Sequence, residues 1–339
     1  MNITILDDYA NMVRGFPCFA KLDGHHFDIW NDHVTDDDLL AERLSDTEAL
    51  VLLRERTPIS AALIERLPKL KLITQNGPYP HIDIEACTRQ GILVCAGHAR
   101  KSDATAELTW GLILCAMRSI PQEMARLKAG GWQQTVGTGL RGRTLGLYGF
   151  GQIGSQLAQF GKAFGMNVLV WARERGLAAA ARSGFATAST AMALFESSDV
   201  LSLHIRLSAE TRAIIGAREL ARMKPDALLV NTSRAGIIAP GALEQALRAG
   251  RPGRAAVDVY ETEPVPPDHP LISMENVICT PHLGYMERDQ MSSYYDAQFE
   301  RILAFARGEF RDAVNPGALA NRDHNEGTGR FRPQQRSES

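Results

Sequence analysis

Four polar residues follow three separate apolar segments in the second half of the chain. Arg234 follows ALLVNTS, Asp258 and Glu263 lie in DVYETEP after RAAV, and His282 ends NVICTPH. Parallel α/β sheets bind ligands beyond the carboxyl ends of their strands, so these residues are expected at one sheet edge. Each residue alone is typical of a solvated surface or a loop. Their joint placement at this edge favours a functional site over four unrelated surface residues.

A glycine-rich turn precedes this group. The segment TLGLYGFGQIG ends in Gly149, Gly151 and Gly154, and an amphipathic stretch follows it. In a dinucleotide-binding turn the first glycine makes the tight bend, the second admits the pyrophosphate and the third lets helix and strand pack closely. The amides of Gln152 and Ile153 would then hold the anion at a helix N-terminus. The turn predicts dinucleotide binding, with a purely structural glycine turn as the alternative.

The next strand, VLVWARER, lacks the acid that usually hydrogen-bonds the ribose 2′-OH of NAD. Ala172 stands at that position and Arg173 follows it. An aspartate would repel a 2′-phosphate, whereas an arginine can pair with one. The strand therefore favours NADP as the cofactor. The alternative is that Arg173 is a solvated loop charge and that NAD binds.

Composition sets broad limits on the chain. It has 339 residues, 45% hydrophobic and 22% charged, with a formal net charge of −2. This length allows two domains, and the charge indicates neither nucleic acid nor a membrane as a partner. The five cysteines form no CxxC pair, which argues against a zinc site or a disulfide framework and predicts no metal. We expect a cytoplasmic protein.

Apolar strands alternate with helical stretches in two blocks, which predicts an α/β fold. We expect two Rossmann-like domains with doubly wound parallel sheets and a cleft between them. Residues 1–101 and 288–319 would form a discontinuous, flavodoxin-like substrate domain, because a late helix after residue 287 returns to it. Residues 102–287 would form the dinucleotide-binding domain, and residues 320–339 a disordered tail rich in polar residues.

Four motifs together carry a resemblance. GFGQIG, VNTSRAGII, AAVDVYETEP and TPHLGY look like those of the NAD(P)-dependent D-2-hydroxyacid dehydrogenases, over about residues 49–314. The resemblance implies that Arg234 binds and polarises a 2-oxo acid. It also implies that His282 is the acid and base and that Glu263 orients it. The further residues that it places at the cofactor are His204, Ile205, Thr232, Asp258 and Gly284.

The same resemblance places substrate residues in the first domain. Arg54, in LLRERT, would approach the substrate carboxylate, although a surface salt bridge is its alternative. Asn76 and Gly77 belong to a loop whose backbone amides grip the carboxylate. Pro78 and Pro80 have no N–H, so Gly77 and Tyr79 would have to donate.

The resemblance implies an enzyme that interconverts 2-oxo and D-2-hydroxy acids as a homodimer, with residues 104–132 in the contact. The alternative is a dinucleotide-sensing regulatory protein of the C-terminal-binding-protein type with little turnover. Turnover of a 2-oxo acid separates the two hypotheses.

Overall fold

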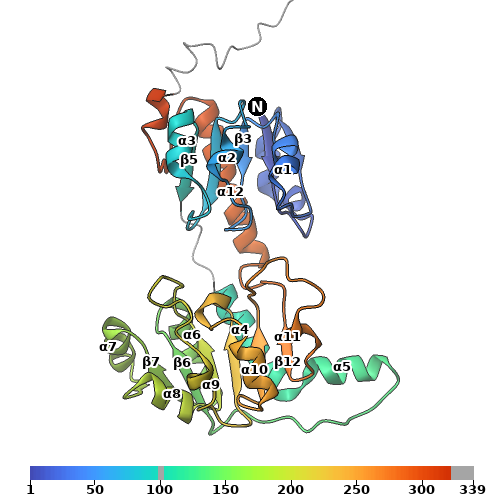
Figure 1. Ribbon diagram of the computed structural model, residues 1–339, viewed down its shortest axis with the longest axis vertical. Helices are drawn as coiled ribbons and strands as arrows, with labels where there is room; N and C mark the ends of the chain where they lie inside the picture. The colour runs from blue at the N-terminus through green and yellow to red at the C-terminus, as the bar shows by residue number, and fades with distance from the viewer. Residues whose placement is uncertain (98–102, 322–339) are drawn as a thin grey trace, which may run out of the picture. The chain divides into compact units, whose positions relative to one another are not determined.

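The computed structural model describes residues 1–97 and 103–321 (Figure 1). It divides into two compact units, which are described separately. One comprises the described residues of Met1–Lys101 and Arg288–Ser339, and the other those of Ser102–Glu287. Most of the predicted tail lies outside the described residues, but its first two residues, Ala320 and Asn321, are helical.

The first unit is built on a five-stranded sheet in the order β2-β1-β3-β4-β5, with every pair parallel. Its strands are β1 Asn2–Ile5, β2 His26–Ile29, β3 Ala49–Val51, β4 Leu72–Asn76 and β5 Leu93–Gly97. The strands β3 and β4 are buried throughout and β5 over its first three residues, as expected of strands that are covered on both faces.

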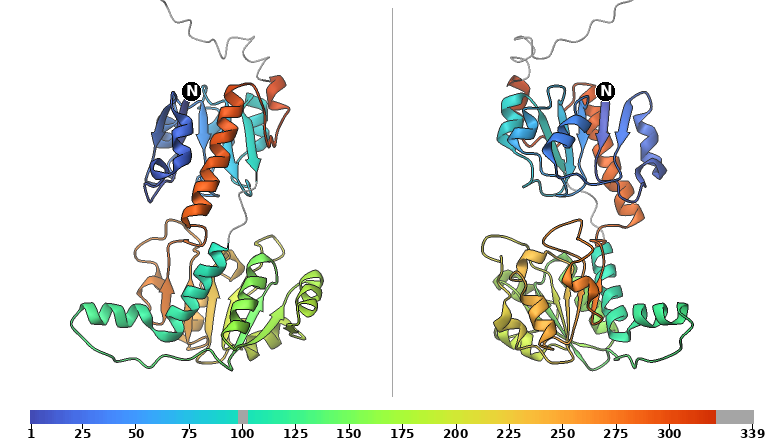
Figure 2. Two further views of the ribbon diagram at one scale, coloured as in Figure 1. Left: turned by 180° about the vertical axis from the view of Figure 1, so that it is seen from behind. Right: turned by 45° about the vertical axis from the view of Figure 1, so that its right-hand side comes forward.

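Helices cover both faces of this sheet. One face carries α1 Asp37–Arg43, α2 Ala61–Ile64 and α3 Ile84–Gln90, whose apolar residues share one core cluster with the strands. The opposite face carries the long α12 Arg288–Ala306, which also packs on the 3-10 helix η2 Pro17–Leu22 (Figure 2). A second 3-10 helix, η1 Val13–Gly15, precedes η2.

The second unit contains a seven-stranded parallel sheet in the order β12-β11-β10-β9-β6-β7-β8. Its strands are β6 Thr144–Tyr148, β7 Asn167–Trp171, β8 Ala186–Thr187, β9 Val200–Leu203, β10 Leu228–Asn231, β11 Arg254–Val257 and β12 Val277–Cys279. The chain starts in the middle at β6, winds outward through β7 and β8, and then crosses to β9. The exits of β6 and β9 therefore flank the switch point, where such sheets bind ligands.

Two helical layers cover the second sheet (Figure 1). One layer contains α4 Ala104–Arg118, α6 Gln152–Ala163 and α7 Glu174–Arg182, whose apolar residues share one core cluster with the strands. The other contains α8 Ala191–Ser197, α9 Ala217–Leu220, α10 Ala242–Arg248 and α11 Pro270–Ser273. The remaining helices are α5 Ile120–Lys128 and the 3-10 helix η3 Ala235–Ile237.

The predicted α/β fold with two parallel sheets is confirmed. Two edge strands, β2 and β8, had no clear signal, because both are short and partly or fully exposed. In the part of the chain that the structure describes, no helix is long and apolar enough to span a membrane.

Candidate active site

The glycine turn after β6 is shaped by close backbone contacts. A Cβ on Gly149, which has φ +109°, would lie 2.3 Å from the carbonyl oxygen of His204, and one on Gly154 would lie 2.4 Å from the oxygen of Gly149. A Cβ on Gly151 would meet no described atom within 4 Å. Gly149 and Gly154 thus serve the packing of this unit, whereas Gly151 leaves space for a ligand beside the N-terminus of α6.

A pocket of about 970 Å³ opens at this turn. A volume of this size suits a dinucleotide. Five of the predicted cofactor residues line it, namely Gly149, Gly151, Arg173, His204 and Ile205. Burial lowers the pKa of His204 to about 3, so its imidazole is neutral, and its Nε2 lies 2.7 Å from the hydroxyl of Ser202. The residues present therefore fit a nicotinamide dinucleotide.

The end of β7 contributes Ala172 and Arg173 to this pocket. The Arg173 guanidinium lies 2.8 Å from a carboxylate oxygen of Glu210, and the two side chains are 76% and 78% exposed. An exposed ion pair of this kind contributes little free energy, about 0–1 kcal/mol. Arg173 can therefore exchange Glu210 for another anion at small cost.

Arg234 follows β10 and starts the turn that leads into η3. The buried Asn231 holds this turn, because its amide donates to the carbonyl oxygen of Arg234 at 3.1 Å and accepts from the N–H of Ser233. The Ser233 hydroxyl donates to the carbonyl oxygen of Ile205 at 2.7 Å, which ties this loop to the exit of β9. Thr232 shares a 2.7 Å hydroxyl contact with Thr109 of α4.

Asp258, at the exit of β11, is fully buried. Its carboxylate accepts from the Thr280 hydroxyl at 2.6 Å and from the amides of Leu283 and Gly284 at 2.7 and 2.9 Å. Burial raises the pKa of Asp258, and the three hydrogen bonds oppose that rise. Asp258 therefore anchors the loop after β12; the predicted contact with nicotinamide stays a prediction.

That loop carries His282, whose backbone is in the left-handed region at φ 55°. Nδ1 of His282 lies 2.6 Å from a carboxylate oxygen of Glu263, and both side chains are 18% exposed. The other oxygen of Glu263 accepts from the amide of Tyr260. With Nδ1 held by the carboxylate, Nε2 is the ring nitrogen that can exchange a proton with a ligand. Because β10, β11 and β12 are neighbours, Arg234, Glu263 and His282 follow adjacent strands.

In the first unit, one tyrosine of α12 joins two of the predicted substrate segments. The Tyr294 hydroxyl donates to the carbonyl oxygen of Asn76 at 2.9 Å and accepts from the amide of Arg54 at 3.2 Å. Arg54 has a left-handed backbone with φ 60°. A Cβ on Gly77 would lie 3.9 Å from a guanidinium nitrogen of Arg54, so the structure brings these two residues together.

The side chain of Asn76 faces the interior and is 1% exposed. Its amide donates to the carbonyl oxygen of Tyr294 at 2.6 Å, and its oxygen accepts from the guanidinium of Arg301 at 2.6 Å. These bonds support a positioning role for the Asn76 side chain, which holds the loop end of β4 against α12.

Gly77 was predicted to donate its backbone N–H to a substrate carboxylate, but in the structure this N–H is used within the sheet. The N–H of Gly77 donates to the carbonyl oxygen of Gly97 at 2.8 Å, because the pairing of β4 with β5 continues past Asn76. Pro78 and Pro80 have no N–H, so Tyr79 is the one residue from Gly77 to Pro80 whose amide remains as a candidate donor to a ligand. The Tyr79 side chain is partly exposed.

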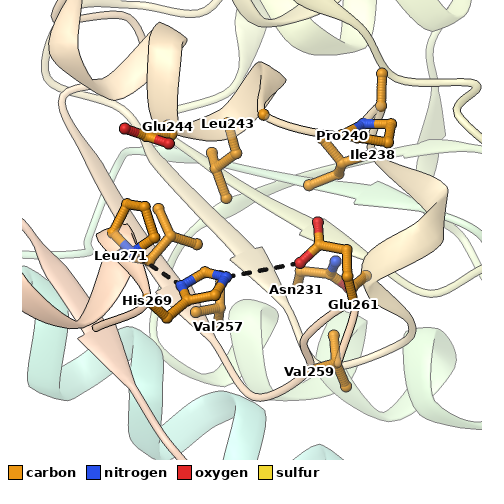
Figure 3. A pocket seen from close by; sticks show the side chains of 14 residues that line it. Asn231, Ile238, Pro240, Leu243, Glu244, Val257, Val259, Glu261, His269 and Leu271 are labelled. Carbon is orange, nitrogen blue, oxygen red and sulfur yellow. Dashed lines mark hydrogen bonds and ion pairs between the residues drawn. The ribbon is translucent and has the colours of Figure 1, made fainter. Parts of the chain in front are cut away.

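A smaller hollow of about 200 Å³ lies beside the turn after β10 (Figure 3). Its lining includes Asn231, Ala235, Glu261 and His269, and Figure 3 shows His269 paired with Glu261, with 3.7 Å between Nε2 and a carboxylate oxygen. The lining contains neither Arg234, Glu263 nor His282. Among residues 1–97 and 103–321, no cluster of three or more His, Cys, Asp or Glu side chains is placed to hold a metal ion.

Several supporting residues were missed by the sequence analysis. Asn231 lies within the VNTSRAGII motif and was overlooked, whereas Tyr294 and Arg301 lie far along the chain from the residues they hold. Arg206 lines the large pocket two residues after His204, and this proximity was a signal that could have found it.

A family model described as "D-isomer specific 2-hydroxyacid dehydrogenase, NAD binding domain" matches residues 110–284. A D-3-phosphoglycerate dehydrogenase of Methanocaldococcus jannaschii is 38% identical over 284 residues, which are 83% of this chain and 54% of that protein. The chain therefore spans about half the length of this relative. A glyoxylate reductase of Aeropyrum pernix is 36% identical over 323 residues, 91% of this chain and 94% of that protein.

Solved structures agree with these matches. An oxidoreductase structure from Ralstonia solanacearum is 48% identical with a TM-score of 0.91, covering 94% of this chain and 98% of that one. A phosphoglycerate oxidoreductase from Vibrio cholerae is 47% identical with a TM-score of 0.88, covering 91% and 99% of the two chains.

The Tyr294 hydroxyl gives a testable prediction for the first unit. In Tyr294→Phe the Asn76 carbonyl and the Arg54 amide lose their partner in a buried place, which costs about 1–3 kcal/mol of unfolding free energy. Chemical denaturation followed by circular dichroism measures this loss. Tyr295→Phe is the matched control, since the Tyr295 ring packs on Phe299 and Phe16. Equal stability of Tyr294→Phe and the wild type would contradict a stabilising role for the two hydrogen bonds of the Tyr294 hydroxyl.

Proposed function

This chain belongs to the family of D-isomer specific 2-hydroxyacid dehydrogenases, and we propose that it interconverts a small 2-oxo acid and the D-2-hydroxy acid with NAD(P)(H). The observation that carries the proposal is the His282–Glu263 pair, with 2.6 Å between Nδ1 and the carboxylate oxygen. It lies in the unit whose switch point has the dinucleotide turn. We assign the substrate as a class, a 2-oxo acid, without choosing between glyoxylate and longer acids.

The residues of the second unit divide the chemistry among them. Bound nicotinamide would supply the hydride to the carbonyl carbon in reduction. Negative charge then develops on the carbonyl oxygen, where the Arg234 cation stabilises it and Nε2 of His282 donates a proton. Glu263 holds the ring orientation through Nδ1 and stabilises the imidazolium. In oxidation His282 accepts the same proton.

The first unit supplies the proposed carboxylate-binding groups, the Arg54 guanidinium and the Tyr79 amide. The left-handed backbone of Arg54 is held by Tyr294, and the loop after β4 is held by Arg301 and by Gln75, whose amide donates to the carbonyl oxygen of Pro78 at 2.9 Å. Groups held by buried partners lose little freedom on binding, which favours affinity for a small anion.

We propose NADP as the preferred cofactor. Ala172 offers no carboxylate to the ribose hydroxyls, and Arg173 can exchange the weak Glu210 pair for a 2′-phosphate.

Cytoplasmic location stays a prediction from the cysteine content.

The function is tested by offering glyoxylate, hydroxypyruvate and phenylpyruvate with NADPH or NADH and following absorbance at the nicotinamide band. We expect turnover of at least one acid, with a lower KM for NADPH than for NADH. Chiral analysis of the product should show the D-isomer. Tight cofactor binding without turnover of any acid would instead support a dinucleotide sensor, and a lower KM for NADH would overturn the NADP assignment.

The proton-transfer role is tested by His282→Gln. Loss of a general acid lowers kcat by about 10²–10⁴-fold, while NADPH affinity measured by calorimetry should stay near the wild-type value. His269→Gln is the matched control, because His269 is also paired with a glutamate of the same unit. Near-normal kcat in His282→Gln at all pH values would remove the residue from the reaction.

We propose a homodimer that buries one face of α5. No residue of α5 is buried, and Ile120, Met124 and Leu127 recur at helical spacing with exposures of 40%, 54% and 59%. Trp132, just beyond the helix, is 72% exposed. A second copy of the chain is the proposed cover, as the family resemblance implies.

Light scattering should therefore give twice the 37.2 kDa of one chain. The double variant Met124→Glu with Leu127→Glu should shift the particle to one chain, because charges would be buried in the interface. Arg182→Glu, on the exposed side of α7, is the control and should stay dimeric. A double variant that keeps the dimer mass would show that α5 lies outside the contact.

A further inference from the structure

The segment after β9 crosses over the exits of two other strands. At the ends of β7, β6 and β9, Tyr148 is level with Trp171 on one side and with Leu203 on the other. Glu210 follows β9, yet its carboxylate lies 2.8 Å from Arg173 at the exit of β7. Neighbouring strands are about 4.8 Å apart, so the segment spans about 10 Å across the exit of β6. The exit of β6 is the glycine turn, and the segment from His204 to Glu210 therefore passes over it.

Arg206 lies in this crossing segment and lines the same pocket as Gly151, Ala172 and Arg173. Its side chain is exposed, and the guanidinium has no hydrogen bond or ion pair with another residue in the described part of the chain. The other charged residues of the lining already form an ion pair or a hydrogen bond within the protein. Arg173 pairs with Glu210, and Glu219 accepts from the amide of Gly216 at 2.9 Å.

We propose that Arg206 binds a phosphate of the dinucleotide cofactor, an inference that rests on the proposed function. The pocket combines a helix N-terminus, an open Gly151 and an arginine that forms no ion pair in the described part of the chain. Each of these features favours an anion, and a guanidinium can bind phosphate oxygens in a bidentate manner. The dinucleotide offers two sources of that chemistry, the pyrophosphate at the glycine turn and the 2′-phosphate of NADP at the exit of β7.

The two sources separate in a binding experiment without any 2-oxo acid. Dissociation constants of NADPH and NADH are measured by nucleotide fluorescence and calorimetry for the wild type, Arg206→Ala, Arg206→Lys and Arg173→Ala. Arg218→Ala is the control, because Arg218 is an exposed arginine of α9 that is absent from the pocket lining. It removes the same charge from the unit.

We expect Arg206→Ala to weaken nucleotide binding about tenfold or more, with partial recovery in Arg206→Lys. An equal loss for NADPH and NADH assigns Arg206 to the pyrophosphate. A loss confined to NADPH, matching that of Arg173→Ala, assigns it to the 2′-phosphate. Both results support a phosphate contact.

Unchanged affinity for both nucleotides in Arg206→Ala, while the wild type binds and turns over a 2-oxo acid, would overturn this inference alone. A loss of the same size in Arg218→Ala would overturn it too, because the effect would then be one of general charge. Failure of the wild type to bind either nucleotide would overturn the proposed function together with it.

Discussion

One buried carboxylate organises the strand exits of the second unit at which the candidate site lies. Asp258 accepts three hydrogen bonds from the loop after β12, at 2.6, 2.7 and 2.9 Å. A buried carboxylate without such donors would be costly to ionise, so the loop must keep Thr280, Leu283 and Gly284 in place. His282 lies between these donors in the sequence and has a left-handed backbone. The contact between His282 and Glu263 therefore depends on a residue that is itself fully buried.

The same logic recurs at the other strand exits. Asn231 closes the Arg234 turn with its own amide, and Ser233 connects that turn to Ile205 after β9. In the first unit Tyr294 and Arg301 hold the exits of β3 and β4. In each case the residue proposed to meet a ligand is held by a buried polar partner, which preorganises the site before a ligand arrives.

Sequence patterns were informative where the physics is local. The apolar runs of β3, β4 and β10 predict buried parallel strands. The roles predicted for the three glycines of the β6 turn agree with the space around each of them. The contact between Glu263 and His282 follows from adjacent strand exits. What failed was non-local: the Gly77 amide meets Gly97 on the next strand, and no local pattern reports this register. Tyr294 lies 218 residues after Asn76, so the hydrogen bond from its hydroxyl could not be predicted from a local pattern either. The path of the β9 segment toward Arg173 likewise brings together residues 37 positions apart, which no local pattern reports.

The return of α12 to the first unit also orders events during synthesis. The second unit is one continuous stretch, Ser102–Glu287, and can assemble once that stretch has left the ribosome. The first unit is still incomplete at that point, because α12, which covers one face of its sheet, is translated later. The hydrogen-bond partners of the Asn76 side chain, Tyr294 and Arg301, also belong to this late helix. The part of the protein that is translated first is therefore finished last, and its exposed sheet face is the surface that a chaperone would have to shield on the nascent chain.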